Sequence, residues 1–154
     1  MPRTPDFETS SLGHLDEIYR VAYSLLPNQA SAQSAVERTY LEADRKGAPP
    51  AGISTRVWLL SILIRTIRRS PARWFSLPLR KGEVDPVFRA LQKVPFREAA
   101  AVVLSDAMDL SGEDMAAILQ TSAGTIAACL ARARRILAAN LTHYAKRESC
   151  VAAV

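Results

Sequence analysis

The chain has few of the residues that build catalytic or metal sites. Its 154 residues include two cysteines and two histidines, without CxxC or HExxH spacing. His14 and His143 stand near opposite ends, and no glycine-rich phosphate loop occurs. We therefore expect no enzyme activity, no cofactor, no metal and no small-molecule substrate. Cys129 and Cys150 are expected to be free thiols.

Long apolar segments are also lacking. No uncharged apolar run reaches the roughly 18 residues of a membrane-spanning helix. Residues 1–13 lack the basic-then-apolar pattern of a signal peptide. We expect a cytoplasmic protein with no membrane insertion.

The few glycines and prolines divide a helical pattern into segments. Apolar residues recur at helical spacing over residues 12–26, 31–43 and 57–64, and again over 86–91, 96–107, 111–119 and 122–137. Residues 70–85 hold Pro71, Pro78 and Gly82, which exclude one continuous helix there. With 49% hydrophobic residues, the chain suits two very small all-α domains. We expect domains at 1–69 and 86–141, a linker at 70–85 and a tail at 142–154.

The helix expected at residues 57–64 is apolar on nearly every side, since only Ser61 is polar. A helix that is apolar all round is buried. It should be the central helix of the first domain, with Trp58 in the core.

Positive charge is concentrated just beyond this helix. The net charge of +5 comes from a middle third with ten basic and three acidic residues, and residues 56–81 hold seven basic residues and no acid. Arg65, Arg68 and Arg69 share one helix face, and Arg73 continues the cluster beside Trp74 and Phe75. This pattern indicates a phosphate-contacting surface, to which Trp74 and Phe75 add aromatic rings. The alternatives are a solvated basic face, and aromatic rings that only cover the core.

The last third of the chain predicts a helix-turn-helix. Ser111 followed by Asp114 is a helix start, and Gln120 and Thr121 form the turn. The second helix opens at Ser122 and buries one face. Its inner residues are Ile126, Leu130, Ala133 and Leu137, and its outer residues are Ala127, Ala128, Ala131, Arg132 and Arg135. The outer face therefore begins with alanines, which offer no hydrogen bonds to DNA bases.

These motifs resemble the bacterial extracytoplasmic-function sigma factors. The resemblance rests on residues 94–137, where Gly124, Thr125 and Ile126 precede an Arg-Ala-Arg run at 132–134. Residues 14–46 resemble the first helices of the sigma N-terminal domain. Residues 55–69, with Trp58, Leu59 and Ile62, resemble its promoter-opening helix.

The resemblance implies partners and site residues. The partners are RNA polymerase core, promoter DNA and an anti-sigma protein. Polymerase contacts fall on Ser34, Glu37, Tyr40 and Leu41, and DNA contacts fall on Arg65, Arg68, Arg69, Arg73, Ser122, Thr125, Arg132 and Arg135.

The chain departs from the family pattern at these same surfaces. Ser34 and Glu37 stand where an acidic residue and a glutamine are usual, and Arg65 replaces an asparagine. Gln120 replaces the turn glycine, which costs about 1 kcal/mol at positive φ. Ala127 and Cys129 replace basic residues.

Three functions remain open from the sequence. The first is an alternative sigma factor held by an anti-sigma protein. The second is a sigma mimic that binds an anti-sigma protein without specific DNA binding, and the third is another helix-turn-helix regulator. The sixteen residues 70–85 reach at most about 55 Å. Two promoter elements two DNA turns apart are separated by about 70 Å, so bridging is strained. The alanine face and this short reach favour the mimic, and the basic block favours the sigma factor.

Overall fold

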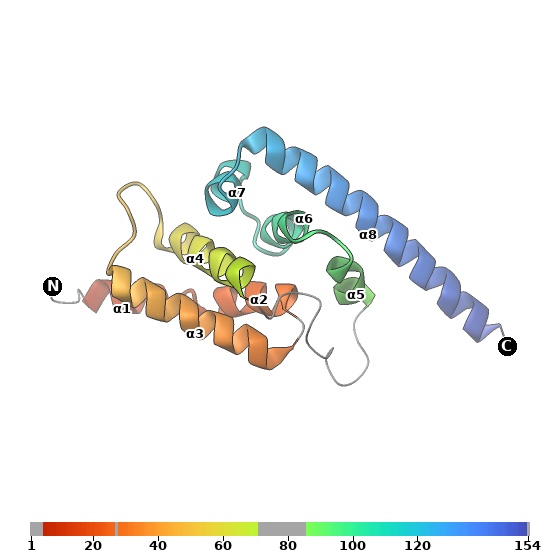
Figure 1. The fold of residues 1–154 in the computed structure, drawn as a ribbon, viewed down its shortest axis with the longest axis horizontal. Helices are drawn as coiled ribbons and strands as arrows, with labels where there is room; N and C mark the ends of the chain where they lie inside the picture. Colours follow the sequence, from red (N-terminus) through yellow and green to blue (C-terminus); the bar gives the residue numbers. More distant parts are fainter. Residues whose placement is uncertain (1–4, 27, 71–85, 154) are drawn as a thin grey trace.

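The computed structural model describes residues 5–26, 28–70 and 86–153. Over these ranges the chain forms helices and no strand, which confirms the all-α prediction (Figure 1). The elements are α1 (Pro5–Leu12), α2 (Leu15–Leu25), α3 (Gln29–Lys46), α4 (Thr55–Arg69), α5 (Pro86–Gln92), α6 (Phe96–Val102), the π-helical turn η1 (Val103–Ala107), α7 (Gly112–Leu119) and α8 (Ala123–Ala152).

The first helical unit contains α1 to α4. Asn28 caps α3 by accepting a hydrogen bond from the Ser31 amide at 2.8 Å, and Ser54 caps α4 by accepting one from the Val57 amide at 3.2 Å. Capping of this kind stabilises a helix by about 1 kcal/mol. Gly47 ends α3 at a φ of 86°, a conformation that favours glycine. These signals give α3 a longer span than the expected 31–43.

The prediction of one helix over residues 12–26 is wrong at its start. The chain breaks at Gly13 and His14, and a separate α1 precedes the break. Glycine disfavours a helix interior by about 1 kcal/mol relative to alanine. Because of the break, Leu12 and Leu15 are 60% and 40% exposed and do not join the inner stripe.

The second unit contains α5 to α8. The helix expected over 96–107 begins as α6 and widens into η1, which inserts an extra residue per turn. Ser111 caps α7 by accepting a hydrogen bond from the Asp114 amide at 3.2 Å. Gln120, which stands where the family has a turn glycine, adopts the left-handed conformation at φ 53°. Helices α7 and α8 then diverge by 93°, the geometry of a helix-turn-helix.

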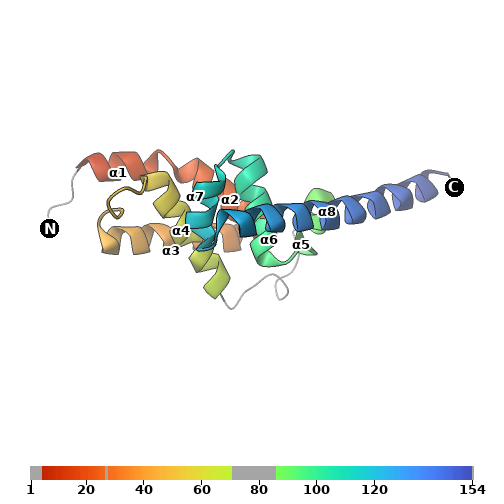
Figure 2. The same cartoon turned by 90° about the horizontal axis from the view of Figure 1, so that it is seen from above.

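Helix α8 is the longest element, with 30 residues. Residues 142–152, expected as a tail, continue this helix. Its far half extends beyond α5, so the two termini lie at opposite ends of an elongated molecule (Figures 1 and 2).

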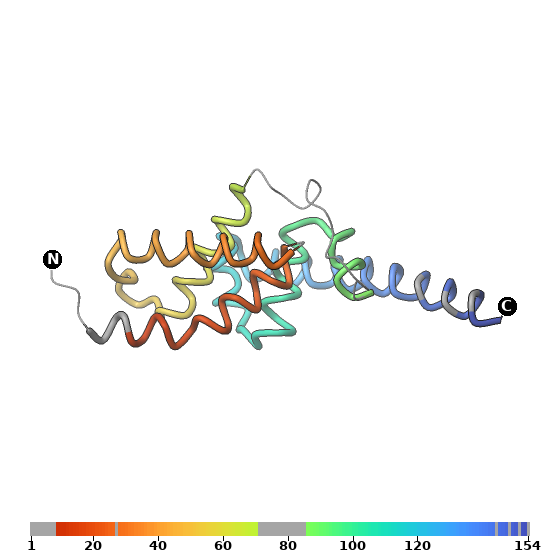
Figure 3. The backbone as a smooth tube through the Cα atoms, turned by 90° about the horizontal axis from the view of Figure 1, so that it is seen from below, coloured from red at the N-terminus to blue at the C-terminus, as the bar shows by residue number. Residues whose placement is uncertain are grey.

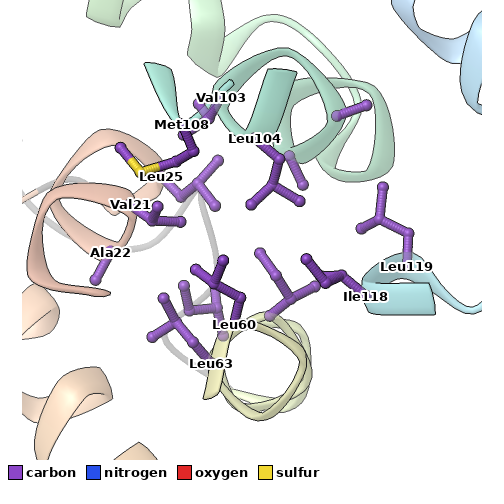
Figure 4. Close-up of a cluster of buried hydrophobic side chains, with 14 of the residues drawn as sticks. Val21, Ala22, Leu25, Leu60, Leu63, Val103, Leu104, Met108, Ile118 and Leu119 are labelled. Carbon is purple, nitrogen blue, oxygen red and sulfur yellow. The ribbon is translucent and has the colours of Figure 1, made fainter. Parts of the chain in front are cut away.

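One apolar core joins the two units. Side chains of α2 and α4 point toward side chains of η1 and α7, including Leu60 and Leu63 against Leu104, Ile118 and Leu119 (Figure 4). The sequence left open whether the units pack together. The tube view also shows the segment of η1 and α7 beside α2 and α4 (Figure 3).

Arg56 adds a polar tie across this contact. Its Nε donates to Glu17 Oε1 at 2.6 Å, and its Nη2 donates to the Met108 carbonyl at 2.7 Å. The hydrogen bond to Glu17 raises the pKa of Arg56 above its usual value. The guanidinium therefore stays charged while it links α2, α4 and the end of η1.

Among the described residues, no single helix has the length and apolar composition to cross a membrane. The helix-turn-helix pair, residues 112–119 with 123–147, meets those criteria only when its two helices are counted together, and it is bent by 93°.

The shared core predicts one cooperative unfolding transition. Leu104→Ala removes a fully buried side chain between the units and should lower the free energy of unfolding by about 2–5 kcal/mol. Leu41→Ala is the matched control, because Leu41 is 65% exposed. Urea unfolding, followed by circular dichroism and by tryptophan fluorescence, measures the free energy of unfolding of both variants. Transitions at different urea concentrations for the two probes would contradict a shared core.

Candidate functional site

The basic end of α4 emerges from the core as the sequence predicted. Arg68 and Arg69 are exposed, whereas Arg65 is half-buried. Arg65 Nη2 lies 3.7 Å from Glu42 Oε1 on α3. Arg73, Trp74 and Phe75 lie outside the described residues. The structure thus brings together three of the four expected arginines.

Glu42 lies between basic side chains of α3 and α4. Its Oε1 accepts from Lys46 Nζ at 2.8 Å. The hydrogen bond from Lys46 lowers the pKa of Glu42, and the charge of Arg65 lowers it further. Glu42 therefore remains ionised at neutral pH and attracts the Arg65 guanidinium on the side facing α3.

A cleft of about 620 Å³ lies beside the three arginines. Its other wall comes from the second unit and includes Arg97 at the start of α6 and Gln120 in the helix-turn-helix turn. A smaller hollow of about 200 Å³, lined by Arg38 and Glu42 among others, adjoins it through Arg65 and Arg69. The basic surface therefore spans α3, α4 and α6.

Arg38 and Arg97 were missed by sequence reasoning. Each lies outside the basic block of residues 56–81 and next to a glutamate, Glu37 or Glu98, so neither forms part of a basic cluster in the sequence. Only the packing of α3 and of the second unit against α4 brings them near Arg65. No sequence signal could have shown this proximity.

The start of α8 places Ser122 and Thr125 together. The Thr125 amide donates to Ser122 Oγ at 3.2 Å, and the two hydroxyl oxygens are 2.9 Å apart. Ser122 is exposed and Thr125 is half-buried. Both hydroxyls thus lie at the accessible N-terminus of the helix, where backbone amides favour an anion.

The arginines of α8 differ in their surroundings. Arg132 Nη1 donates to Glu98 Oε1 at 2.7 Å, and Glu98 is only 6% exposed. Arg134 donates to the exposed Asp106 at 2.8 Å. Arg135 is exposed and makes no ion pair with any residue that the structure describes. Arg132 therefore ties α8 to α6 through Glu98 while 57% of its side chain stays exposed, and Arg135 is available for a phosphate.

The outer face of α8 is as poor in hydrogen-bonding groups as the sequence indicated. Ala127, Ala128 and Ala131 are all exposed. The comparison of Cys129 with a basic DNA-reading position is wrong, because Cys129 is 4% exposed and packs in the core. Cys150 is exposed, and both cysteines are unpaired.

The expected polymerase residues on α3 fall into two groups. Glu37 and Leu41 are exposed and Ser34 is half-buried, and their spacing places them on one helix face. The Tyr40 hydroxyl instead donates to the Ser11 carbonyl at 2.7 Å, which ties α3 to α1. Burial raises the pKa of Tyr40 to about 12. Tyr40 therefore serves as a partly buried tie between helices beside the exposed face.

Within the described ranges, no three His, Cys, Asp or Glu side chains are grouped so that they could hold a metal ion.

The helix-turn-helix region matches a known family. Residues 85–137 match the family model of sigma-70, region 4. The chain is also similar to the RNA polymerase sigma factor SigE of the extracytoplasmic-function class from Mycolicibacterium smegmatis. The two are 24% identical over 155 aligned positions, which cover 86% of this chain and 60% of that relative.

Two solved structures resemble the fold over most of its length. The first is the sigma factor RpoE in complex with the anti-sigma factor NepR from Bartonella quintana. It has a TM-score of 0.71 and 25% identity, and the match covers 90% of this chain and 98% of RpoE. The second is CnrH in complex with the cytosolic domain of CnrY. It has a TM-score of 0.72 and 22% identity, and the match covers 89% of this chain and 88% of CnrH.

The ion pairs of α8 predict different roles for neighbouring arginines. Arg132→Gln leaves a buried carboxylate without its partner and should lower the free energy of unfolding by about 1–3 kcal/mol. Arg134→Gln breaks an exposed pair and should cost at most about 1 kcal/mol. Chemical denaturation of the two variants measures this difference. Equal stability of the two would contradict a structural role for Arg132.

Proposed function

We propose that the chain is an alternative sigma factor, which its similarity to sigma-70 region 4, to the extracytoplasmic-function sigma factor SigE and to RpoE supports. In this role it binds RNA polymerase core and promoter DNA, and an anti-sigma protein holds it inactive. Since RNA polymerase is its partner, its location is the cytoplasm.

One observation carries the proposal. The buried helix α4 ends in exposed Arg68 and Arg69, and the second unit presents a capped helix-turn-helix at Ser122 and Thr125. Two separate surfaces are thus equipped for phosphates, as a protein that contacts two promoter elements requires.

Each surface has a proposed set of contacts. Arg65, Arg68, Arg69 and Arg73 contact the opened strand, since basic side chains follow a single-stranded backbone. Ser122, Thr125 and Arg135 contact the upstream element. Arg132 contributes by supporting α8 through Glu98. Glu37, Leu41 and Ser34 form the polymerase face of α3, with Tyr40 fixing that helix against α1.

A second candidate function is a sigma mimic that binds an anti-sigma protein without reading DNA. It is favoured by the exposed alanines of α8, which offer bases no donors or acceptors. It is also favoured by the shared core, which keeps both surfaces in one closed arrangement.

Binding of purified core polymerase by the tagged full chain tests the two candidates. The sigma factor should retain the core subunits through α3, and Leu41→Glu, which places a charge on an exposed apolar contact, should weaken retention about tenfold or more. Leu12→Glu is the matched control, because Leu12 is similarly exposed on α1. No retention of core polymerase by the unmodified chain would favour the mimic.

The basic end of α4 predicts a salt-dependent DNA affinity. Changing Arg65, Arg68 and Arg69 together to alanine should weaken binding to a single-stranded oligonucleotide of any sequence. The slope of log affinity against log salt should fall by about 0.7 for each phosphate that the variant no longer neutralises. Fluorescence anisotropy at several salt concentrations measures the slope.

The matched control changes Arg20, Arg89 and Arg147 to alanine, since all three are exposed and none of them lines the cleft or the adjoining hollow. An equal reduction of the slope in the control would mean that the α4 cluster is only part of a general positive surface.

A further inference from the structure

The cleft between the two units has an unusual charge. Four arginines line it, with Arg65, Arg68 and Arg69 from α4 and Arg97 from α6, and no carboxylate is among the lining residues. The first three belong to the first unit and the fourth to the second. The closed arrangement thus places like charges from both units around one hollow.

This arrangement leaves a buried hydrogen-bond donor without an acceptor and places positive charges in the cleft without a carboxylate in its lining. The Nε atom of Arg65 is buried and has no hydrogen-bond partner among the residues that the structure describes. A buried donor without a partner costs about 1–3 kcal/mol. Glu42 pairs with Arg65, but Arg68, Arg69 and Arg97 make no ion pair with any residue that the structure describes. Their like charges repel one another across a partly enclosed space, where water screens charge less than at an open surface. An anion in the cleft would relieve both costs.

The dimensions of the cleft indicate the size of that anion. Its volume of about 620 Å³ lies within the usual range of about 300–1,000 Å³ for small-molecule sites. Ile64, Ile118 and Leu119 give the wall an apolar part, beside the ring of Phe96. Guanidinium groups bind phosphate through paired hydrogen bonds, and an apolar wall accepts the flat face of a base.

We propose that the cleft binds a phosphate-bearing ligand of nucleotide size, a nucleoside di- or triphosphate. Its phosphates contact Arg97 together with Arg65, Arg68 and Arg69, so that it bridges the two units. Because the complete arginine set exists only when the units are packed together, the ligand stabilises the closed arrangement. The site exists only in the closed arrangement, and under the proposed function the ligand competes with promoter DNA for Arg65, Arg68 and Arg69.

Calorimetric titration of the full chain with GTP tests the site. The unmodified chain should bind GTP, and the ligand should raise the Tm in a concentration-dependent way. Arg97→Gln should weaken GTP binding about tenfold or more, since it removes a charge-assisted contact to phosphate. Arg89→Gln is the matched control, because Arg89 is also exposed in the second unit but lies outside the cleft.

Two further probes separate the sources of binding. Guanosine should bind at least about tenfold more weakly than GTP if phosphate provides the recognition. A ten-nucleotide single-stranded DNA distinguishes a nucleotide site from a groove for a DNA backbone. Binding of the oligonucleotide without binding of GTP would overturn the proposal. An equal reduction of GTP affinity in the two arginine variants, equal affinity for guanosine and GTP, or no binding of GTP would also overturn it.

Discussion

The burial of α4 is the constraint on which the rest of the structure depends. Leu59, Leu60, Ile62 and Leu63 are all fully buried, although their side chains point in different directions around the helix. Helices α2 and α3 can cover only part of such a surface. The remainder is covered by η1 and α7 of the second unit (Figure 4). An apolar helix therefore requires both units for complete burial, and the closed arrangement follows from its composition.

This packing also arranges the candidate binding surfaces. It places Arg97 beside the basic end of α4 and leaves the exposed face of α3, with Glu37 and Leu41, open to a partner. The outer face of α8 remains accessible as well. If the chain bridges two distant promoter elements, the contact between α4 and α7 must open. The energy of that contact then determines how readily the protein binds DNA.

The sequence predicted features that depend on nearby residues. Ser111 as a cap, Gln120 at positive φ and the buried Trp58 follow from local chemistry, and all three are present. The break at Gly13 and the widening into η1 were missed, since one glycine or one inserted residue barely changes apolar periodicity. The pairing of Arg132 with Glu98 was missed because 34 residues separate them, and only the packing of α6 on α8 joins them. Arg97 was missed in the cleft for the same reason.

A distance measurement between the units tests the closed arrangement most directly. Spin labels at Gln33→Cys on α3 and Ala131→Cys on α8 occupy exposed positions in different units. Both native cysteines are replaced first, Cys129 by alanine and Cys150 by serine. Pulsed electron resonance on the full chain alone should give one narrow distance distribution, because the shared core fixes the two helices relative to each other. A broad distribution in the chain alone would contradict the shared core and the account built on it.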